Sequence, residues 1–217
     1  MVPSFSLFRS WALLAVLGSA FLLLGPAHSQ ERSLAFEHIT SDDGLSRSHV
    51  TSITQDHEGF LWVGTTGGLN RYNGYRFTVY EHDPRDSTSI GGSNVRTIYE
   101  DSENVLWIGT ESGLSRYDRD RDTFRNYTSS DTTDFLGETV NTITEDSNGD
   151  LWIGTGNGLN RWDRDTGSFD RYFYDPSNPN SLVGSDVRDV LEDSQGRLWV
   201  ATTNGLDLLD RETGTFT

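Results

Sequence analysis

Short apolar runs alternate with polar turns four times along the chain. Each copy opens with two apolar residues three positions apart, Val50 and Ile53 in the first. Side chains alternate between the two faces of a strand, so residues three apart point to opposite faces. This pattern predicts an inner strand covered on both sides. The pair recurs as Val95 and Ile98, Val140 and Ile143, and Val187 and Val190.

A tight turn and a second strand follow in every copy. The turn opens with aspartate, which accepts backbone N–H bonds, and reaches glycine or asparagine, which tolerate positive φ, three positions later. The strand reads Leu-Trp, then Val or Ile, then Gly or Ala, then Thr; the small residue should give an indole or a neighbouring backbone room to approach. We predict structural roles for the turn residues Asp56, Asp101, Asp146 and Asp193 and for Trp62, Trp107, Trp152 and Trp199.

Two further strands complete each copy, the fourth marked by phenylalanine at 77, 124 and 169. The tryptophans recur at intervals of 45, 45 and 47 residues. Four antiparallel strands in a unit of this length are typical of a propeller blade. The sequence therefore predicts an all-β fold, a β-propeller of four-stranded antiparallel blades at approximately 48–83, 93–130, 138–175 and 185–217.

The two ends of the repeat region predict an incomplete ring. Residues 34–39, with Phe36, resemble an outer strand without its own blade, of the kind that closes a last blade. Phe216 and Thr217 nevertheless begin a fourth strand for the last copy, which would leave the N-terminal strand unused. We therefore expect four blades of a larger propeller, in a truncated chain.

Charge and composition narrow the function classes. The formal net charge is −16, and all 17 basic residues are arginine. Such an acidic surface repels phosphate backbones, so nucleic acid is not expected as a partner. The chain has no cysteine, which excludes a thiol nucleophile, a thiolate zinc site and a lipoprotein anchor.

The first 29 residues are typical of a secretory signal peptide. Arg9 precedes an apolar run over 11–24, and Ala27-His28-Ser29 offers small residues at the spacing of a cleavage site. The run is short for a membrane span. We predict an exported, periplasmic or otherwise extracytoplasmic protein, with an uncleaved signal anchor as the alternative. Contact with a membrane is expected only through an uncleaved or missing segment.

Residues 143–163, from Ile143-Thr144-Glu145-Asp146 through Leu151-Trp152-Ile153-Gly154-Thr155 to Trp162-Asp163, resemble the two-component regulator propeller repeat. The resemblance covers almost everything after Phe36, although Ala201, Leu208 and Leu209 depart from it in the fourth copy. It implies the extracytoplasmic sensor region of a bacterial membrane receptor, often a hybrid histidine kinase.

Candidate ligand contacts lie where the copies differ. Long connections at 81–93 and 175–185 should share one rim of the propeller with the turns between second and third strands, and long loops often carry function. Residues flanking the inner-strand valine on that rim vary among copies, and an alternative is that they only solvate a channel mouth. The ligand-contact candidates are His49, Arg96, Asn141, Asp186 and Arg188, with Arg96 and Asn141 favoured for a polar ligand such as a sugar.

The residue patterns give little indication of catalysis or metal binding. No carboxylate pair stands out from the repeat, no serine lies in a nucleophile elbow, and His38, His57 and His82 lack metal-ligand spacing. Residues 146–150 superficially resemble a calcium loop but already form the repeat's turn. The recurrent arginines 71, 116 and 161 are expected to pair with acids between blades. We expect no catalytic residue, metal or cofactor.

The predicted function is an extracytoplasmic ligand-sensing propeller module of a bacterial two-component receptor, lacking the output domain. Its expected partners are an unknown extracellular ligand, with carbohydrate as the candidate class, and a second copy of the receptor in a homodimer. Two alternatives stay open: a secreted propeller lyase or hydrolase acting on polysaccharide, and a non-catalytic protein-interaction propeller.

Overall fold

A computed structural model describes residues 36–130 and 134–217. The chain separates into a unit ending at His38 and a unit from Ile39 to Thr217, and the second unit holds all the assigned elements. The predicted signal peptide, 1–29, lies outside the described residues. A short 3-10 helix, η1 (Ser41–Asp43), precedes the first sheet.

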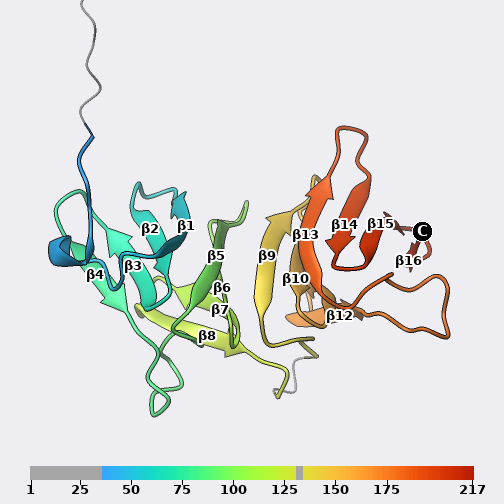
Figure 1. Cartoon of the computed structure of the whole chain (residues 1–217), viewed down its shortest axis with the longest axis horizontal. Helices are drawn as coiled ribbons and strands as arrows, with labels where there is room; N and C mark the ends of the chain where they lie inside the picture. Colours follow the sequence, from blue (N-terminus) through green and yellow to red (C-terminus); the bar gives the residue numbers. More distant parts are fainter. Residues whose placement is uncertain (1–35, 131–133) are drawn as a thin grey trace, which may run out of the picture. The chain divides into compact units, whose positions relative to one another are not determined.

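Sixteen strands of the described chain form four separate sheets of four (Figure 1). The first blade contains β1 (Val50–Gln55), β2 (Leu61–Thr65), β3 (Gly68–Tyr72) and β4 (Phe77–Tyr80). The second contains β5 (Val95–Glu100), β6 (Leu106–Thr110), β7 (Gly113–Asp118) and β8 (Thr123–Tyr127). The third contains β9 (Val140–Glu145), β10 (Leu151–Thr155), β11 (Gly158–Asp163) and β12 (Ser168–Tyr172). The fourth contains β13 (Val187–Glu192), β14 (Leu198–Thr202), β15 (Gly205–Asp210) and β16 (Thr215–Phe216).

Every sheet runs antiparallel in sequence order, which is the topology of a propeller blade. The predicted all-β class and the four-stranded blades are therefore confirmed. Of the expected closing strand at 34–39, the described part, 36–39, is not in a strand. Its role in closing a blade stays a prediction.

Consecutive blades meet through their inner strands, β1 against β5, β5 against β9 and β9 against β13. We call these contacts the first, second and third joints. At each joint a valine of the following blade fills the notch left by a glycine: a Cβ on Gly109, for example, would lie 2.5 Å from Cγ1 of Val140. The repeat's glycine thus makes room for a side chain of the next blade rather than for an indole or backbone.

The turn aspartate of each blade also holds the tryptophan. In the second blade, Oδ1 of Asp101 accepts the backbone N–H groups of Glu103 and Val105, at 3.0 and 2.8 Å. Its Oδ2 accepts the indole N–H of Trp107 at 2.9 Å. Corresponding indole bonds join Trp62 to Asp56, Trp152 to Asp146 and Trp199 to Asp193. One carboxylate therefore closes the turn and orients the largest core side chain.

An arginine from the following blade binds the same carboxylate. Arg164, in the turn between β11 and β12, reaches Asp101 at 3.0 Å and Glu145 at 2.8 Å. The side chain of Asp101 has no exposed surface, so the guanidinium neutralises a buried charge. We call this arrangement the inter-blade clamp; Arg119 forms it at the first joint and Arg211 at the third.

The arginines expected to make these contacts do so only in part. Arg71 lies 3.7 Å from Asp122 of the next blade, but Arg161 pairs with Asp150 and Asp170 of its own blade. Arg116 packs over the Trp107 ring and has no acidic partner in the described chain. The clamp arginines lie three residues further along, in the next turn, where their side chains reach across the joint.

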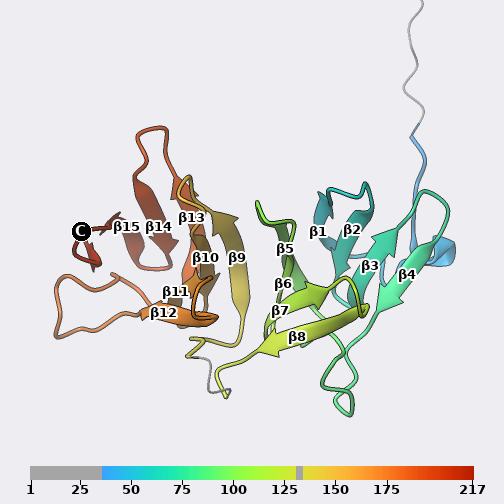
Figure 2. The same cartoon turned by 180° about the vertical axis from the view of Figure 1, so that it is seen from behind.

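The long connections between blades have a structural role. The connection from β4 to β5 loops past β8 (Figure 2). Within it, Ile90 is fully buried and the Thr88 carbonyl accepts the Phe124 N–H of β8. In the connection from β12 to β13, Leu182 is buried and the Asn180 carbonyl accepts the Phe216 N–H of β16. Each connection thus adds backbone pairing and one core residue to the outer part of the following blade.

The clamp carboxylate of Asp146 makes stability depend on pH. Burial alone would raise the pKa of Asp146, but hydrogen bonds from the Trp152 indole and the Arg211 guanidinium hold that pKa below its ordinary value. A folded-state pKa below the unfolded value stabilises the fold above about pH 4, and that contribution is lost as pH falls further. We expect the free energy of unfolding in urea to decline below about pH 4, and less steeply in Asp146→Asn.

The matched control is Asp165→Asn, because Asp165 is exposed and its carboxylate has no hydrogen bond in the described chain. This variant should follow the wild-type pH profile. Equal acid sensitivity in Asp146→Asn and the wild type would contradict a role for this carboxylate in acid unfolding.

Candidate functional site

Three of the five rim residues come together across the third joint. The Asn141 side-chain amide donates to Oδ1 of Asp186 at 3.0 Å and to the Val187 carbonyl at 2.8 Å. Arg188 forms an ion pair with the other oxygen of Asp186. The Asn141 carbonyl oxygen is buried and has no hydrogen-bond partner in the described chain, which leaves one acceptor at this cluster unused.

His49 and Arg96 do not join that cluster. Both side chains are exposed, and neither has a hydrogen bond or ion pair in the described residues. Thr51, two residues after His49 and within β1, donates to the Val95 carbonyl at 2.5 Å, which is the bond that Asn141 makes to Val187. The side chains of Thr51 and Asn141 therefore link one inner strand to the next. A ligand contact by His49 or Arg96 stays a prediction.

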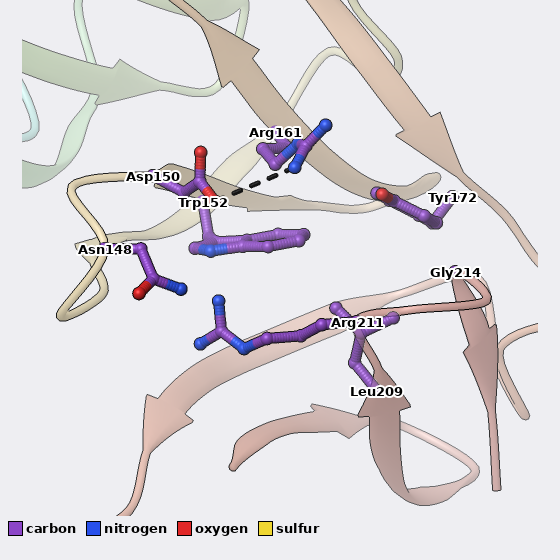
Figure 3. A pocket seen from close by; sticks show the side chains of 8 residues that line it. All are labelled: Asn148, Asp150, Trp152, Arg161, Tyr172, Leu209, Arg211 and Gly214. Atoms are coloured by element: carbon purple, nitrogen blue, oxygen red, sulfur yellow. Dashed lines mark ion pairs between the residues drawn. The ribbon is translucent and has the colours of Figure 1, made fainter. Parts of the chain in front are cut away.

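A hollow of about 230 Å³ lies between the third and fourth blades, beside the tight turns rather than the long connections (Figure 3). We call it the third-joint hollow. In Figure 3 the Trp152 ring lies between the guanidinium groups of Arg161 and Arg211, and the Tyr172 hydroxyl points toward Arg161. The hollow is lined by Asn148, Asp150, Trp152, Arg161, Tyr172, Leu209, Arg211 and Gly214.

The first joint shows what normally fills this space. There the Tyr117 ring packs edge-on against Trp62, with centroids 5.0 Å apart. The Tyr117 hydroxyl accepts a bond from Arg71 at 2.9 Å and donates to Asp122. Asp122 also accepts from the Tyr80 hydroxyl at 2.6 Å. One ring and one carboxylate thus bind the arginine and tyrosine side chains beside the tryptophan.

The second joint is filled by a larger ring. Trp162 packs edge-on against Trp107 and Tyr127, with centroids 5.4 and 5.5 Å apart. At the third joint the equivalent residue is Leu209, which is shorter, and Gly214 stands where the first joint has Asp122. The third-joint hollow therefore lies beside the position that Tyr117 and Trp162 fill at the other two joints.

Both arginines beside the hollow already form ion pairs within the chain. Arg211 is held by Asp146 and Glu192 as a clamp arginine. Arg161 pairs with Asp170 and lies 3.7 Å from Asp150. Burial raises the pKa of Tyr172, so its phenol is protonated at neutral pH, and its hydroxyl has no hydrogen bond within the described chain. The hollow offers a phenol, an amide and a half-exposed guanidinium beside an indole.

Sequence reasoning noted the change to leucine at 209 but did not connect it with a site. The signal was present: one core position is Tyr117 in the second copy, Trp162 in the third and Leu209 in the fourth. A loss of ring volume at a packed joint leaves a cavity unless the backbones move together.

Comparison with known proteins agrees with this architecture. The sequence model described as two component regulator propeller matches residues 44–67, 89–112, 134–157 and 181–204. The chain belongs to the two component regulator propeller family. Each match runs from the approach to an inner strand through the Leu-Trp strand to the following turn, and there is one match in each blade. The predicted family membership is confirmed.

Relatives of this propeller chain include signalling proteins. Histidine kinase P4 of Formosa agariphila is 42% identical over 82 residues, which are 38% of this chain and 6% of that protein. The extracellular domain of the putative hybrid two component system BT3049 from B. thetaiotaomicron is 28% identical with a TM-score of 0.58, over 83% of this chain and 31% of that chain. The corresponding domain of BT4673 is 27% identical with a TM-score of 0.62, over 76% of this chain and 22% of that chain.

A propeller enzyme shares the fold. Virginiamycin B lyase from Staphylococcus aureus is 21% identical with a TM-score of 0.55, over 78% of this chain and 54% of that chain. This likeness concerns the blades alone. No helix in the described part of the propeller chain is long and apolar enough to cross a membrane.

Proposed function

We propose that the chain is an extracytoplasmic ligand-sensing module of a bacterial two-component receptor and is not itself catalytic. The observation that carries this proposal is the one-per-blade match to two component regulator propeller repeats, together with the likeness to extracellular domains of two hybrid two component systems. The chain spans less than a third of either domain, so we further propose that more blades and an output domain belong to the intact receptor.

The exposed faces of the end blades support more blades. The inner-strand valine and isoleucine are buried in the second and third blades, yet Val50 and Ile53 are 45% and 64% exposed. On the fourth blade, Leu206 is 61% exposed, whereas its counterparts Leu69, Leu114 and Leu159 are fully buried. Apolar residues exposed at repeat positions favour cover by neighbouring blades.

A rigid blade array would transmit a signal by changing how propellers or receptor copies contact each other, because a ligand shifts an equilibrium only by binding one arrangement better. The joints described above fit this mechanism, since each one combines a buried tryptophan with an inter-blade clamp. We therefore propose that signalling reorients the array as a body.

The gene tests the receptor architecture directly. The reading frame that contains these 217 codons should continue through further propeller repeats, one membrane-spanning helix and a histidine kinase or other output domain. A frame that ends in a polysaccharide-degrading domain would replace the sensor with an enzyme, and a frame that encodes no membrane helix or output domain would contradict the proposal.

A further inference from the structure

The third-joint hollow differs from the first joint by the loss of two specific groups, and from the second joint by the loss of the ring alone, because Gly167 already stands at the position of Asp122 there. At the first joint the chain supplies a phenol ring, from Tyr117, and a carboxylate, from Asp122. At the third joint Leu209 and Gly214 stand in their places, while the surrounding tryptophan, tyrosine and arginine are kept as Trp152, Tyr172 and Arg161. The third joint therefore keeps the side chains that surround the phenol and the carboxylate at the first joint, but it lacks those two groups themselves.

The retained groups have spare bonding capacity. At the first joint, the tyrosine hydroxyl of the outer strand donates to Asp122 at 2.6 Å, and Arg71 donates to the Tyr117 hydroxyl. At the third joint the Tyr172 hydroxyl has no partner within the described residues, and Arg161 bonds only to carboxylates of its own blade. A buried or half-buried polar group is stabilised by any partner that satisfies it.

The walls favour a flat ring. Trp152 and Leu209 line the hollow, and at the other two joints the tryptophan packs edge-on against the ring that stands at the position of Leu209. Leu209 supplies an apolar wall, and Gly214 has no side chain to close the hollow. Edge-to-face ring packing contributes beyond the buried area alone. A single aromatic ring in the hollow would therefore have an indole and a leucine to pack against.

We propose that the third-joint hollow binds a small aromatic molecule that carries an anionic or hydroxyl group, such as a phenolic carboxylate. Its ring takes the place of the Tyr117 ring, and its polar group takes the bonds that Asp122 and the Tyr117 hydroxyl make at the first joint. The inference rests on the proposed sensor function only for its signalling consequence, because binding itself is a property of this chain.

The test uses 4-hydroxybenzoate as probe and isothermal calorimetry on the purified chain. We expect one saturable site in the wild type and at least tenfold weaker binding in the double variant Leu209→Tyr/Gly214→Asp, which rebuilds the first joint's filling. The replacement fits the backbone: Gly214 has φ of 68°, and the equivalent Asp122 already adopts φ of 56°. Each single variant, Leu209→Tyr and Gly214→Asp, provides a second reading if the double variant does not fold.

A second double variant tests the proposal in the opposite direction, by removing the ring and the carboxylate from the first joint. Tyr117→Leu/Asp122→Gly should open an equivalent hollow at the first joint and raise the stoichiometry from one to two. Glucose serves as the comparison ligand, and no saturable glucose binding is expected.

Unchanged probe binding in both the filled and the single variants would overturn the site. Saturable glucose binding that is lost on filling would overturn the ligand class. Absence of saturable probe binding below about 10 mM would overturn the proposal itself. None of these results depends on whether the receptor signals, so failure here is distinguishable from failure of the sensor function.

Discussion

Replacing Trp107 with alanine is expected to lower the free energy of unfolding by about 3–5 kcal/mol. Trp107 is almost completely buried at the second joint, and its ring contacts those of Tyr127 and Trp162. The substitution opens a cavity and also removes the indole donor from the buried carboxylate of Asp101. Urea denaturation followed by circular dichroism measures the loss.

The repeat provides a matched control in Trp199→Ala. Trp199 occupies the same strand position and makes the same bond to Asp193, but it is only partly buried. Its replacement should cost less than half as much as that of Trp107. Equal losses at the two positions would show that joint packing does not determine the contribution of the repeated tryptophan.

Replacing Arg164 with alanine is expected to lower the free energy of unfolding by about 3–5 kcal/mol, because it leaves the buried carboxylate of Asp101 without its counter-charge. The same change removes contacts to Glu145 and to the Gly149 carbonyl. The loss of stability should therefore exceed that of an ordinary surface ion pair. The measurement is again the unfolding free energy in urea at neutral pH.

Arg121→Ala is the control for the change in net charge. Arg121 pairs with Asp118 in a turn of the second blade, but its side chain is 76% exposed. An exposed pair contributes about 0–1 kcal/mol, so this variant should remain near the wild type. If Arg164→Ala were equally mild, the inter-blade clamp would have no role in holding blades together.

The sequence predicted the blade because every feature of the blade is local. A valine and isoleucine three residues apart, an aspartate turn and a Leu-Trp strand all lie within one copy, and repetition removes the ambiguity of a single short pattern. The sequence indicated only one of the two roles of the turn aspartate. Its backbone bonds follow from turn chemistry, whereas its bond to the indole six residues later depends on how the hairpin folds.

The joints could not be predicted in the same way. Arg164 and Asp101 are 63 residues apart, and several arginines in each copy could have met that acid. The sequence favoured Arg71, Arg116 and Arg161, which lie on the strand, whereas the clamp arginine lies in the next turn. Which of two neighbouring arginines crosses a joint depends on blade packing, and a linear pattern does not contain that information.

The candidate sites, too, could be predicted from the sequence only in part. Asn141, Asp186 and Arg188 were singled out because they vary, and the structure brings them together without showing what they bind. The third-joint hollow lies where Leu209 replaces the ring of the other two joints. A missing ring leaves either a collapsed joint or an open space, and only the packed structure shows which one results.

The most direct test of the sensor account compares two strains of the source bacterium. One carries the intact gene and the other an in-frame deletion of codons 39–217, with immunoblots establishing equal receptor levels. Transcript profiles are recorded across one panel of growth media. The account predicts that a set of genes responding to at least one medium in the first strain no longer responds in the second. Identical profiles in every medium would contradict it.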